Sequence, residues 1–226
     1  MYNNGKERQE DMIKVENLKL ILNKRTILTD IDLCFEEGKI YGLTGNNGCG
    51  KTMLMKCICG FVKPSSGSVI CEGKRVGKDI DYLADTGIII ENPCFIGYYP
   101  GFKNLKLLAG IKNKPDPVRI KETMKTCGLD PDLRLPVRKY SLGMRQRLGI
   151  AQAIMEDQKI LILDEPMNGL DIDGISEMRE LLLRLKNEGK LIILASHNTE
   201  DIRILCDDII KMDKGRIVEI RHSPVS

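Results

Sequence analysis

The sequence predicts an α/β protein in which a sheet core carries an antiparallel β subdomain and an inserted helical subdomain. Short apolar strands alternate with helical patterns in both halves of the chain, which is typical of a parallel sheet with both faces covered. Alternating apolar and polar residues before residue 36 predict antiparallel strands ahead of that sheet. Between residues 92 and 157 the apolar periodicity becomes helical, and prolines separate the pieces.

The first part of the chain supplies most of the predicted strands. In order, we expect strands at residues 13–22, 31–35, 39–44, 68–71 and 86–91 and a helix at residues 51–59. The strand at residues 86–91 is apolar until it ends on Glu91, which predicts a central position in the sheet.

The rest of the chain adds the helical insertion and completes the sheet. We expect helices at residues 105–111, 118–127 and 142–155, then a strand at 159–164, a helix at 172–188, a strand at 191–196, a helix near 201–206 and a strand at 209–212. This pattern predicts a single domain at residues 12–222 behind a polar tail at residues 1–11. Its core with the β subdomain comprises residues 12–91 and 158–222, and its helical subdomain comprises residues 92–157.

Composition excludes several classes of protein. With 42% hydrophobic and 30% charged residues, the chain resembles an ordinary globular protein, and a net charge of +3 is too small to indicate direct nucleic-acid binding. No apolar run is long enough to span a bilayer, and residues 1–11 lack the apolar centre of a secretion signal. We therefore expect a cytoplasmic protein that reaches the inner face of the cell membrane only through a membrane partner.

The cysteines do not follow the pattern of a disulfide framework or a zinc site. Cys34, Cys57, Cys59 and Cys71 lie in apolar helix or strand patterns, so we expect buried thiols. Cys49 is the expected exception, because Lys51 and a glycine-rich loop give it an electropositive surrounding.

A phosphate-binding loop is the strongest motif of the chain. The pattern G-x-x-x-x-G-K-T is formed by Gly45, Asn46, Asn47, Gly48, Cys49, Gly50, Lys51 and Thr52. A buried strand precedes it and a helix follows, which is the context that this motif requires. The backbone N–H groups and the Lys51 ammonium suit the phosphates of ATP, and the Thr52 hydroxyl suits Mg²⁺. An empty glycine-rich turn is the alternative, which the agreement of the fixed positions and both flanks disfavours.

Two carboxylates follow the apolar strand at residues 159–164. Asp164 is a candidate ligand of Mg²⁺, and Glu165 is a candidate base that orients or deprotonates an attacking water. A strand that ends in Asp-Glu is by itself more often a solvated turn. The phosphate loop upstream reverses that judgement, because carboxyl ends of parallel strands collect ligands at one edge.

Residues 140–147, with the sequence YSLGMRQR, resemble the signature motif of ABC-transporter ATP-binding subunits. Residues 168–171 are similar to the D-loop of that family, and His197 is similar to its switch histidine, which contacts the γ-phosphate. A lone histidine is usually structural, but its place after a predicted strand matches the family position. The resemblance covers residues 13 to about 220 and implies an enzyme that converts ATP and water to ADP and phosphate.

The signature motif has a physical reading of its own. Ser141 precedes a predicted helix, so its hydroxyl and the following N–H groups form an anion site. The resemblance implies that Ser141, Gly143 and Asp171 contact ATP bound to the phosphate loop of a second chain, in a head-to-tail dimer with two composite sites. Leu142 and Met144 depart from the commonest residues of the motif, but Ser141 and Gly143 are retained.

Two further departures concern the nucleotide site. Leu22 occupies the position where the family usually has an aromatic residue stacked on adenine, so we expect weaker discrimination between ATP and GTP. Glu91 stands where most members have a glutamine that contacts Mg²⁺ and the attacking water. A glutamate there is similar to the exporter subfamily associated with resistance to bacitracin and lantibiotic-type peptides. A solvent-facing carboxylate is the alternative for Glu91.

Four aromatic residues cluster after Glu91: Phe95, Tyr98, Tyr99 and Phe102. The family receives a short helix of the membrane subunit in this region, so these side chains are candidates for a docking surface. They are equally candidates for the core of the helical subdomain.

Together these residues predict the ATP-binding and ATP-hydrolysing subunit of an ABC transporter. It would dimerise around Mg²⁺-ATP with a second copy or a paralogous subunit and drive a separate integral membrane permease, with export favoured by Glu91. A soluble ABC-type ATPase that acts on DNA or ribosomes is the alternative, but such relatives usually carry a long coiled coil or two fused cassettes. An ordinary phosphate-loop kinase would leave residues 141–147 unexplained.

Overall fold

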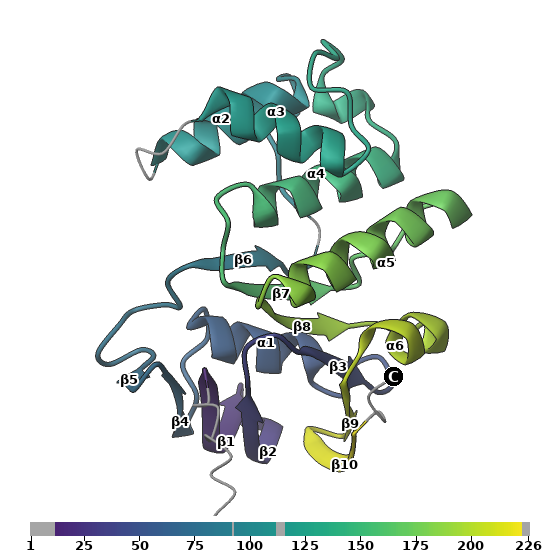
Figure 1. Ribbon diagram of the computed structural model, residues 1–226. Helices are drawn as coiled ribbons and strands as arrows, with labels where there is room; N and C mark the ends of the chain where they lie inside the picture. The colour runs from purple at the N-terminus through teal and green to yellow at the C-terminus, as the bar shows by residue number, and fades with distance from the viewer. Residues whose placement is uncertain (1–11, 92, 112–115, 223–226) are drawn as a thin grey trace, which may run out of the picture.

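Two sheets and a layer of helices make up the computed structural model, which describes residues 12–91, 93–111 and 116–222 (Figure 1). The predicted polar tail, residues 1–11, lies outside the described residues, as does Asn92.

The smaller sheet is antiparallel, as predicted. Its strand order is β2-β1-β4-β5, formed by β1 (Ile13–Leu22), β2 (Arg25–Phe35), β4 (Ser66–Cys71) and β5 (Lys74–Arg75). Asn23 and Lys24 both have positive φ, 49° and 63°, which is the backbone of a two-residue hairpin turn. This turn closes the β1–β2 hairpin.

The larger sheet has six strands in the order β10-β9-β3-β8-β7-β6. These are β3 (Ile40–Thr44), β6 (Thr86–Ile89), β7 (Ile160–Asp164), β8 (Leu191–Ala195), β9 (Asp208–Asp213) and β10 (Arg216–His222). All neighbouring pairs are parallel except β9 with β10. The expected mixture of parallel core and antiparallel subdomain is therefore confirmed.

The central position predicted for the strand that ends near Glu91 is wrong, because β6 lies at the edge of the sheet. An unbroken apolar run indicates that both faces of a strand are covered. It does not indicate that neighbouring strands pair with both of its edges. In β6, Gly87 and Ile89 are buried, and Ile89 belongs to the core shared with the helices. Strand β10 was not predicted, because its alternation is weak and most of its residues are exposed.

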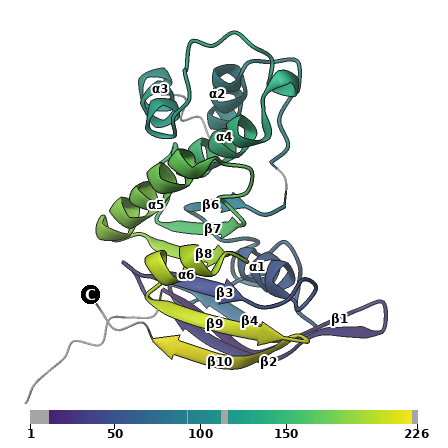
Figure 2. The same cartoon turned by 90° about the vertical axis from the view of Figure 1, so that its right-hand side faces the viewer.

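Helices lie on both faces of the six-stranded sheet (Figures 1 and 2). Their bounds are α1 (Lys51–Cys59), α2 (Gly101–Ile111), α3 (Pro117–Thr126), α4 (Leu142–Ile154), α5 (Ile172–Asn187) and α6 (Thr199–Leu205), with a 3₁₀ turn at Val137–Lys139. One core surrounds α1 between the two sheets and includes Leu18, Leu54 and Ile162. The other covers the opposite face of the sheet with α4 and α5, and it continues into α2 and α3. Within the described ranges, no helix combines the length and the apolarity needed to cross a bilayer.

The cysteine predictions are confirmed in part. Cys57, Cys59 and Cys71 are buried, and burial raises the pKa of the Cys57 and Cys59 thiols to about 12. The prediction for Cys34 is wrong, since it is exposed. Cys34 alternates with the buried Leu33 and Phe35 along β2 and so points to the other side of the strand. Cys49 is buried.

A close approach of α4 to β6 gives a stability prediction. A Cβ on Gly87 would lie 1.8 Å from the Ala153 carbonyl oxygen, whereas a Cβ on Gly110 in α2 would meet nothing within 4 Å. We expect Gly87→Ala to lower the free energy of unfolding by about 3 kcal/mol, because the added methyl group forces the helix off the strand. Gly110→Ala, the matched control, should raise it by about 0.5–1 kcal/mol. Urea unfolding measures both, and equal midpoints would contradict this packing.

Candidate functional site

The phosphate loop connects β3 to α1 and is closed by glycine backbone conformations. Gly45 has φ 140°, and a Cβ at this position would lie 2.2 Å from the Met212 carbonyl oxygen of β9. Only glycine fits this close approach at the point where the chain leaves the sheet. The loop therefore owes its position to the sheet as well as to its own sequence.

Lys51 lies inside this loop, although it carries a charge. Its side chain is largely buried, and the ammonium donates hydrogen bonds to the carbonyl oxygens of Gly45 at 2.7 Å and Asn46 at 3.4 Å. A buried ammonium needs such partners, because an unpaired charge is costly to bury. The loop thus holds a fixed positive charge next to its own N–H groups, which suits an anion with several oxygens.

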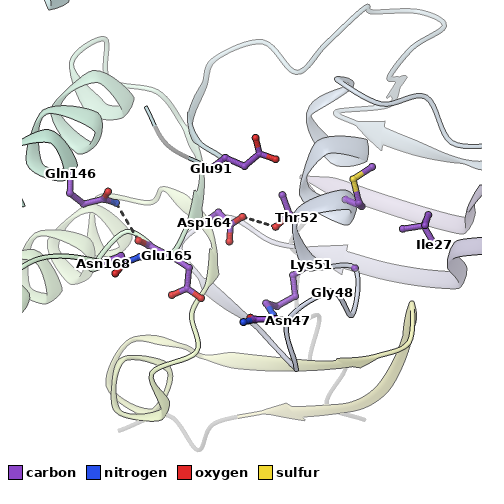
Figure 3. Close-up of a pocket in the computed structure, with 12 residues that line it drawn as sticks. Ile27, Asn47, Gly48, Lys51, Thr52, Glu91, Gln146, Asp164, Glu165 and Asn168 are labelled. Atoms are coloured by element: carbon purple, nitrogen blue, oxygen red, sulfur yellow. Dashed lines mark hydrogen bonds between the residues drawn. The ribbon is translucent and has the colours of Figure 1, made fainter. Parts of the chain in front are cut away.

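Thr52 and Asp164 meet across the site. The Thr52 hydroxyl donates a hydrogen bond of 2.7 Å to a carboxylate oxygen of Asp164, which ends β7 (Figure 3). Hydroxyl and carboxylate oxygens are the ligands that Mg²⁺ prefers, together with water and phosphate oxygens. In the part of the chain that the structure describes, no cluster of three or more His, Cys, Asp or Glu side chains could hold a metal alone. This donor set fits Mg²⁺ that is bound jointly with nucleotide phosphates.

Glu165 and His197 are brought together as a pair. Glu165 follows β7 and His197 follows β8, and the His197 Nδ1 lies 2.7 Å from the Glu165 carboxylate. The backbone of Glu165 is held from two sides: its N–H donates to the Ala195 carbonyl at 2.9 Å, and its carbonyl accepts from the Gln146 side chain at 3.2 Å. The predicted base is therefore fixed to both the sheet and α4.

Glu91 lies at the same site, but much of its side chain is exposed to solvent. It is 66% exposed, and its carboxylate forms an ion pair of 2.5 Å with Lys56 of α1. This exposed carboxylate also lines the cavity beside the phosphate loop, and its contact with Mg²⁺ stays a prediction.

This cavity has a volume of about 600 Å³. Eight predicted site residues line it: Asn47, Gly48, Gly50, Lys51, Thr52, Glu91, Asp164 and Glu165 (Figure 3). Sequence reasoning did not single out Ile27, Gln146 or Asn168, which also line it. Gln146 and Asn168 stand inside the signature and D-loop motifs, so their positions were a usable signal. Gly45, Asn46 and His197 border a neighbouring cavity on the other side of the loop.

Five predicted site residues line neither of these two cavities: Leu22, Cys49, Ser141, Gly143 and Asp171. The Ser141 hydroxyl caps α4 by accepting from the Met144 N–H at 3.1 Å. Asp171 caps α5 by accepting from the Gly174 N–H at 2.9 Å. Gly143 packs closely on the backbone of Gly169. Within one chain, Ser141 and Gly143 of the signature motif therefore lie apart from the cavity beside the phosphate loop, whereas Gln146 of the same motif lines it.

Leu22 ends β1 at the hairpin tip and is 39% exposed. Ile27, on the returning strand β2, lines the cavity instead. Leu22 therefore does not line the cavity, whereas another aliphatic side chain of the same hairpin does, and a contact of Leu22 with the base stays a prediction.

The aromatic cluster is partly packed in the core and partly exposed, and its role as a docking surface stays a prediction. Phe95 and Phe102 pack against the helical core. Tyr98 is 67% exposed and stands edge-on to Tyr99, whose ring also lies 3.6 Å from the Lys103 ammonium.

Comparisons with known proteins agree with this site. Residues 28–168 match the family model described as ABC transporter. The chain is 43% identical over 206 residues to the uncharacterized ABC transporter ATP-binding protein YybJ of Bacillus subtilis, covering 91% of this chain and 94% of YybJ. It is 40% identical over 212 residues to the bacitracin transport ATP-binding protein BcrA of Enterococcus faecalis, covering 93% and 69%. A solved structure of an ATP binding subunit of an ABC transporter superposes with a TM-score of 0.85 at 24% identity, covering 93% and 90%, and shows the same fold.

The hairpin geometry gives a prediction about nucleotide affinity. Ile27→Ala should weaken the binding of ATP and GTP by about tenfold each, because an aliphatic contact covers either base without distinguishing them. Leu22→Ala, the matched control at the exposed hairpin tip, should change either affinity by less than about twofold. Equilibrium binding of fluorescent ATP and GTP measures both. A larger loss for Leu22→Ala would mean that the tip, rather than Ile27, contacts the base.

Proposed function

Since this chain belongs to the ABC transporter family as an ATP-binding subunit, we propose that it binds and hydrolyses ATP in the cavity beside its phosphate loop. The main support for this proposal is that one cavity is lined by residues from distant parts of the chain: Lys51, Thr52, Asp164 and Glu165. A structural ion-pair cluster would not need a loop of backbone N–H groups facing it.

The phosphate loop and Lys51 bind the β- and γ-phosphates, and Thr52, Asp164 and Glu91 would hold Mg²⁺ there. When bound, Mg²⁺ neutralises charge that develops on the phosphate oxygens. The hydrogen bond between Thr52 and Asp164 supports this assignment, because it keeps two oxygen ligands side by side.

Glu165 orients a water molecule for attack on the γ-phosphorus and accepts its proton as the bond to the ADP oxygen breaks. His197 restrains the Glu165 carboxylate through Nδ1 and presents the rest of its ring to the γ-phosphate. Support comes from their 2.7 Å contact and from the Gln146 hydrogen bond, which fixes the backbone of Glu165.

The site is completed by a second copy or a paralogous subunit. Ser141, Gly143 and Asp171 lie outside the cavity of their own chain, so they are available to the ATP of a partner. Two large apolar side chains flank them in exposed positions, Leu142 at 51% and Ile172 at 87%. Covering such apolar surface favours association of two chains. ATP would then lie between the phosphate loop of one chain and the Ser141 helix end of the other.

Closure around ATP and opening after hydrolysis would drive a separate membrane permease from the cytoplasmic side. Similarity to BcrA, a bacitracin transport protein, supports export of a peptide antibiotic as the transported process. The exposed Tyr98, beside Tyr99, supplies an aromatic surface on which a helix of the permease could dock.

Replacing the proposed base tests the chemistry. Glu165→Gln should lower kcat for ATP hydrolysis by about 100-fold or more, because an amide cannot accept the proton of the attacking water. ATP binding should persist, and an ATP-bound dimer should accumulate on size-exclusion chromatography. Glu180→Gln, at an exposed position of α5, is the matched control and should hydrolyse ATP normally. Wild-type turnover by Glu165→Gln would remove this residue from the role of base.

Mixing two inactive variants tests the composite site. Lys51→Met damages the phosphate loop, and Ser141→Arg damages the signature end. Random pairing makes half of the dimers mixed, each with one intact site, so about a quarter of the wild-type activity should return. Steady-state phosphate release measures it. A mixture no more active than its parents would contradict a site shared between two chains.

A further inference from the structure

Lys56 is a charged residue next to the site to which no role has yet been given. It lies four residues after Thr52 in α1, so both side chains project from the same face of the helix. Its ammonium forms the 2.5 Å ion pair with Glu91, and its side chain is 25% exposed. Helix α1 packs in the core between the two sheets, so the backbone of Lys56 is held in place.

The backbone of Glu91 has a less common conformation. It follows the edge strand β6 with φ 62°, a left-handed conformation that is uncommon for a residue with a side chain. The chain then leaves the sheet and leads to α2 (Gly101–Ile111) in the helical layer. The ion pair with Lys56 therefore joins the core helix that begins at the phosphate loop to the point where the chain departs for the helical layer.

The charges around the cavity explain why this pair matters. Glu91, Asp164 and Glu165 all line it, so three carboxylates face the position proposed for the phosphates. The Lys51 ammonium already bonds to the carbonyls of its own loop. An unpaired Glu91 carboxylate would add repulsion for an incoming polyphosphate. The Lys56 ammonium compensates this charge, because it lies 2.5 Å from the Glu91 carboxylate.

We propose that Lys56 is a positioning residue for nucleotide binding: it neutralises and restrains the Glu91 carboxylate, for which Mg²⁺ must compete. This inference rests on the proposed function. It assigns Lys56 no contact with ATP, because Lys56 does not line the cavity, and it acts through Glu91 alone. An exposed ion pair contributes little to folding, so loss of the pair should alter binding rather than stability.

The test is a double-mutant cycle in nucleotide binding, with Lys56→Met, Glu91→Gln and the combination of both. A fluorescent, non-hydrolysable ATP analogue is titrated first in EDTA and then at fixed analogue concentration with increasing Mg²⁺. Lys56→Met should weaken Mg²⁺-free binding about fivefold, because the Glu91 charge is no longer countered. It should also lower the Mg²⁺ concentration at the midpoint about fivefold, because the carboxylate is no longer held by Lys56.

In the Glu91→Gln background the same Lys56→Met change should shift both quantities by less than about twofold. Lys56→Arg keeps the charge and should behave like the wild type. Lys63→Met removes an equal charge from an exposed residue beyond the end of α1 and serves as the matched control. Urea unfolding of each variant checks the fold, and Lys56→Gln replaces Lys56→Met if the latter is unstable.

Two results would overturn the inference. One is an equal effect of Lys56→Met with and without the Glu91 carboxylate, which would mean that Lys56 acts on the nucleotide directly. The other is no effect beyond that of Lys63→Met, which would make the pair an ordinary surface contact. Failure of the proposed function would give a different result, since the unmodified chain would then not bind the analogue at all.

Discussion

The parallel pairing of β3, β8 and β7 is the constraint on which the rest of the molecule depends. In this register Leu43 lies opposite Ala195, and Ala195 lies opposite Asp164. All three strands therefore end on one line, and the residues that follow them emerge at the same edge. The phosphate loop, the Glu165 carboxylate and the His197 ring meet there because one row of backbone hydrogen bonds aligns them.

This alignment places opposite charges on the two sides of the cavity. The β3 side presents N–H groups and the enclosed Lys51, whereas the β7 side presents Asp164 and Glu165. Such an arrangement attracts a polyanion on one side and a cation on the other, which matches a nucleotide that carries Mg²⁺. Ser141 does not line this cavity, so the proposed site of one chain lacks the signature contact that a partner chain would supply.

Local sequence was sufficient for the parts of the site that local backbone geometry determines. The loop at residues 45–52 and the carboxylates after β7 were predictable, because strand, motif and helix follow one another directly. Contacts between distant segments were not. The edge position of β6 and the approach of Ile27 to the cavity depend on strand order and on the course of a hairpin. The Lys56–Glu91 pair likewise joins residues 35 positions apart, which no periodicity indicates.

The helical layer is attached to the site at two places, and both are polar contacts at reactive positions. Gln146 of α4 donates to the backbone carbonyl of Glu165, and Glu91, which forms an ion pair with Lys56, lies between β6 and α2. A displacement of α4 relative to the sheet must therefore either carry the Glu165 backbone with it or break that hydrogen bond. Breaking it would leave the buried Gln146 amide without this partner, which costs free energy. Movement of the helices and the geometry of the proposed base are consequently coupled through named contacts, which is the physical requirement for transmitting nucleotide binding to a membrane partner.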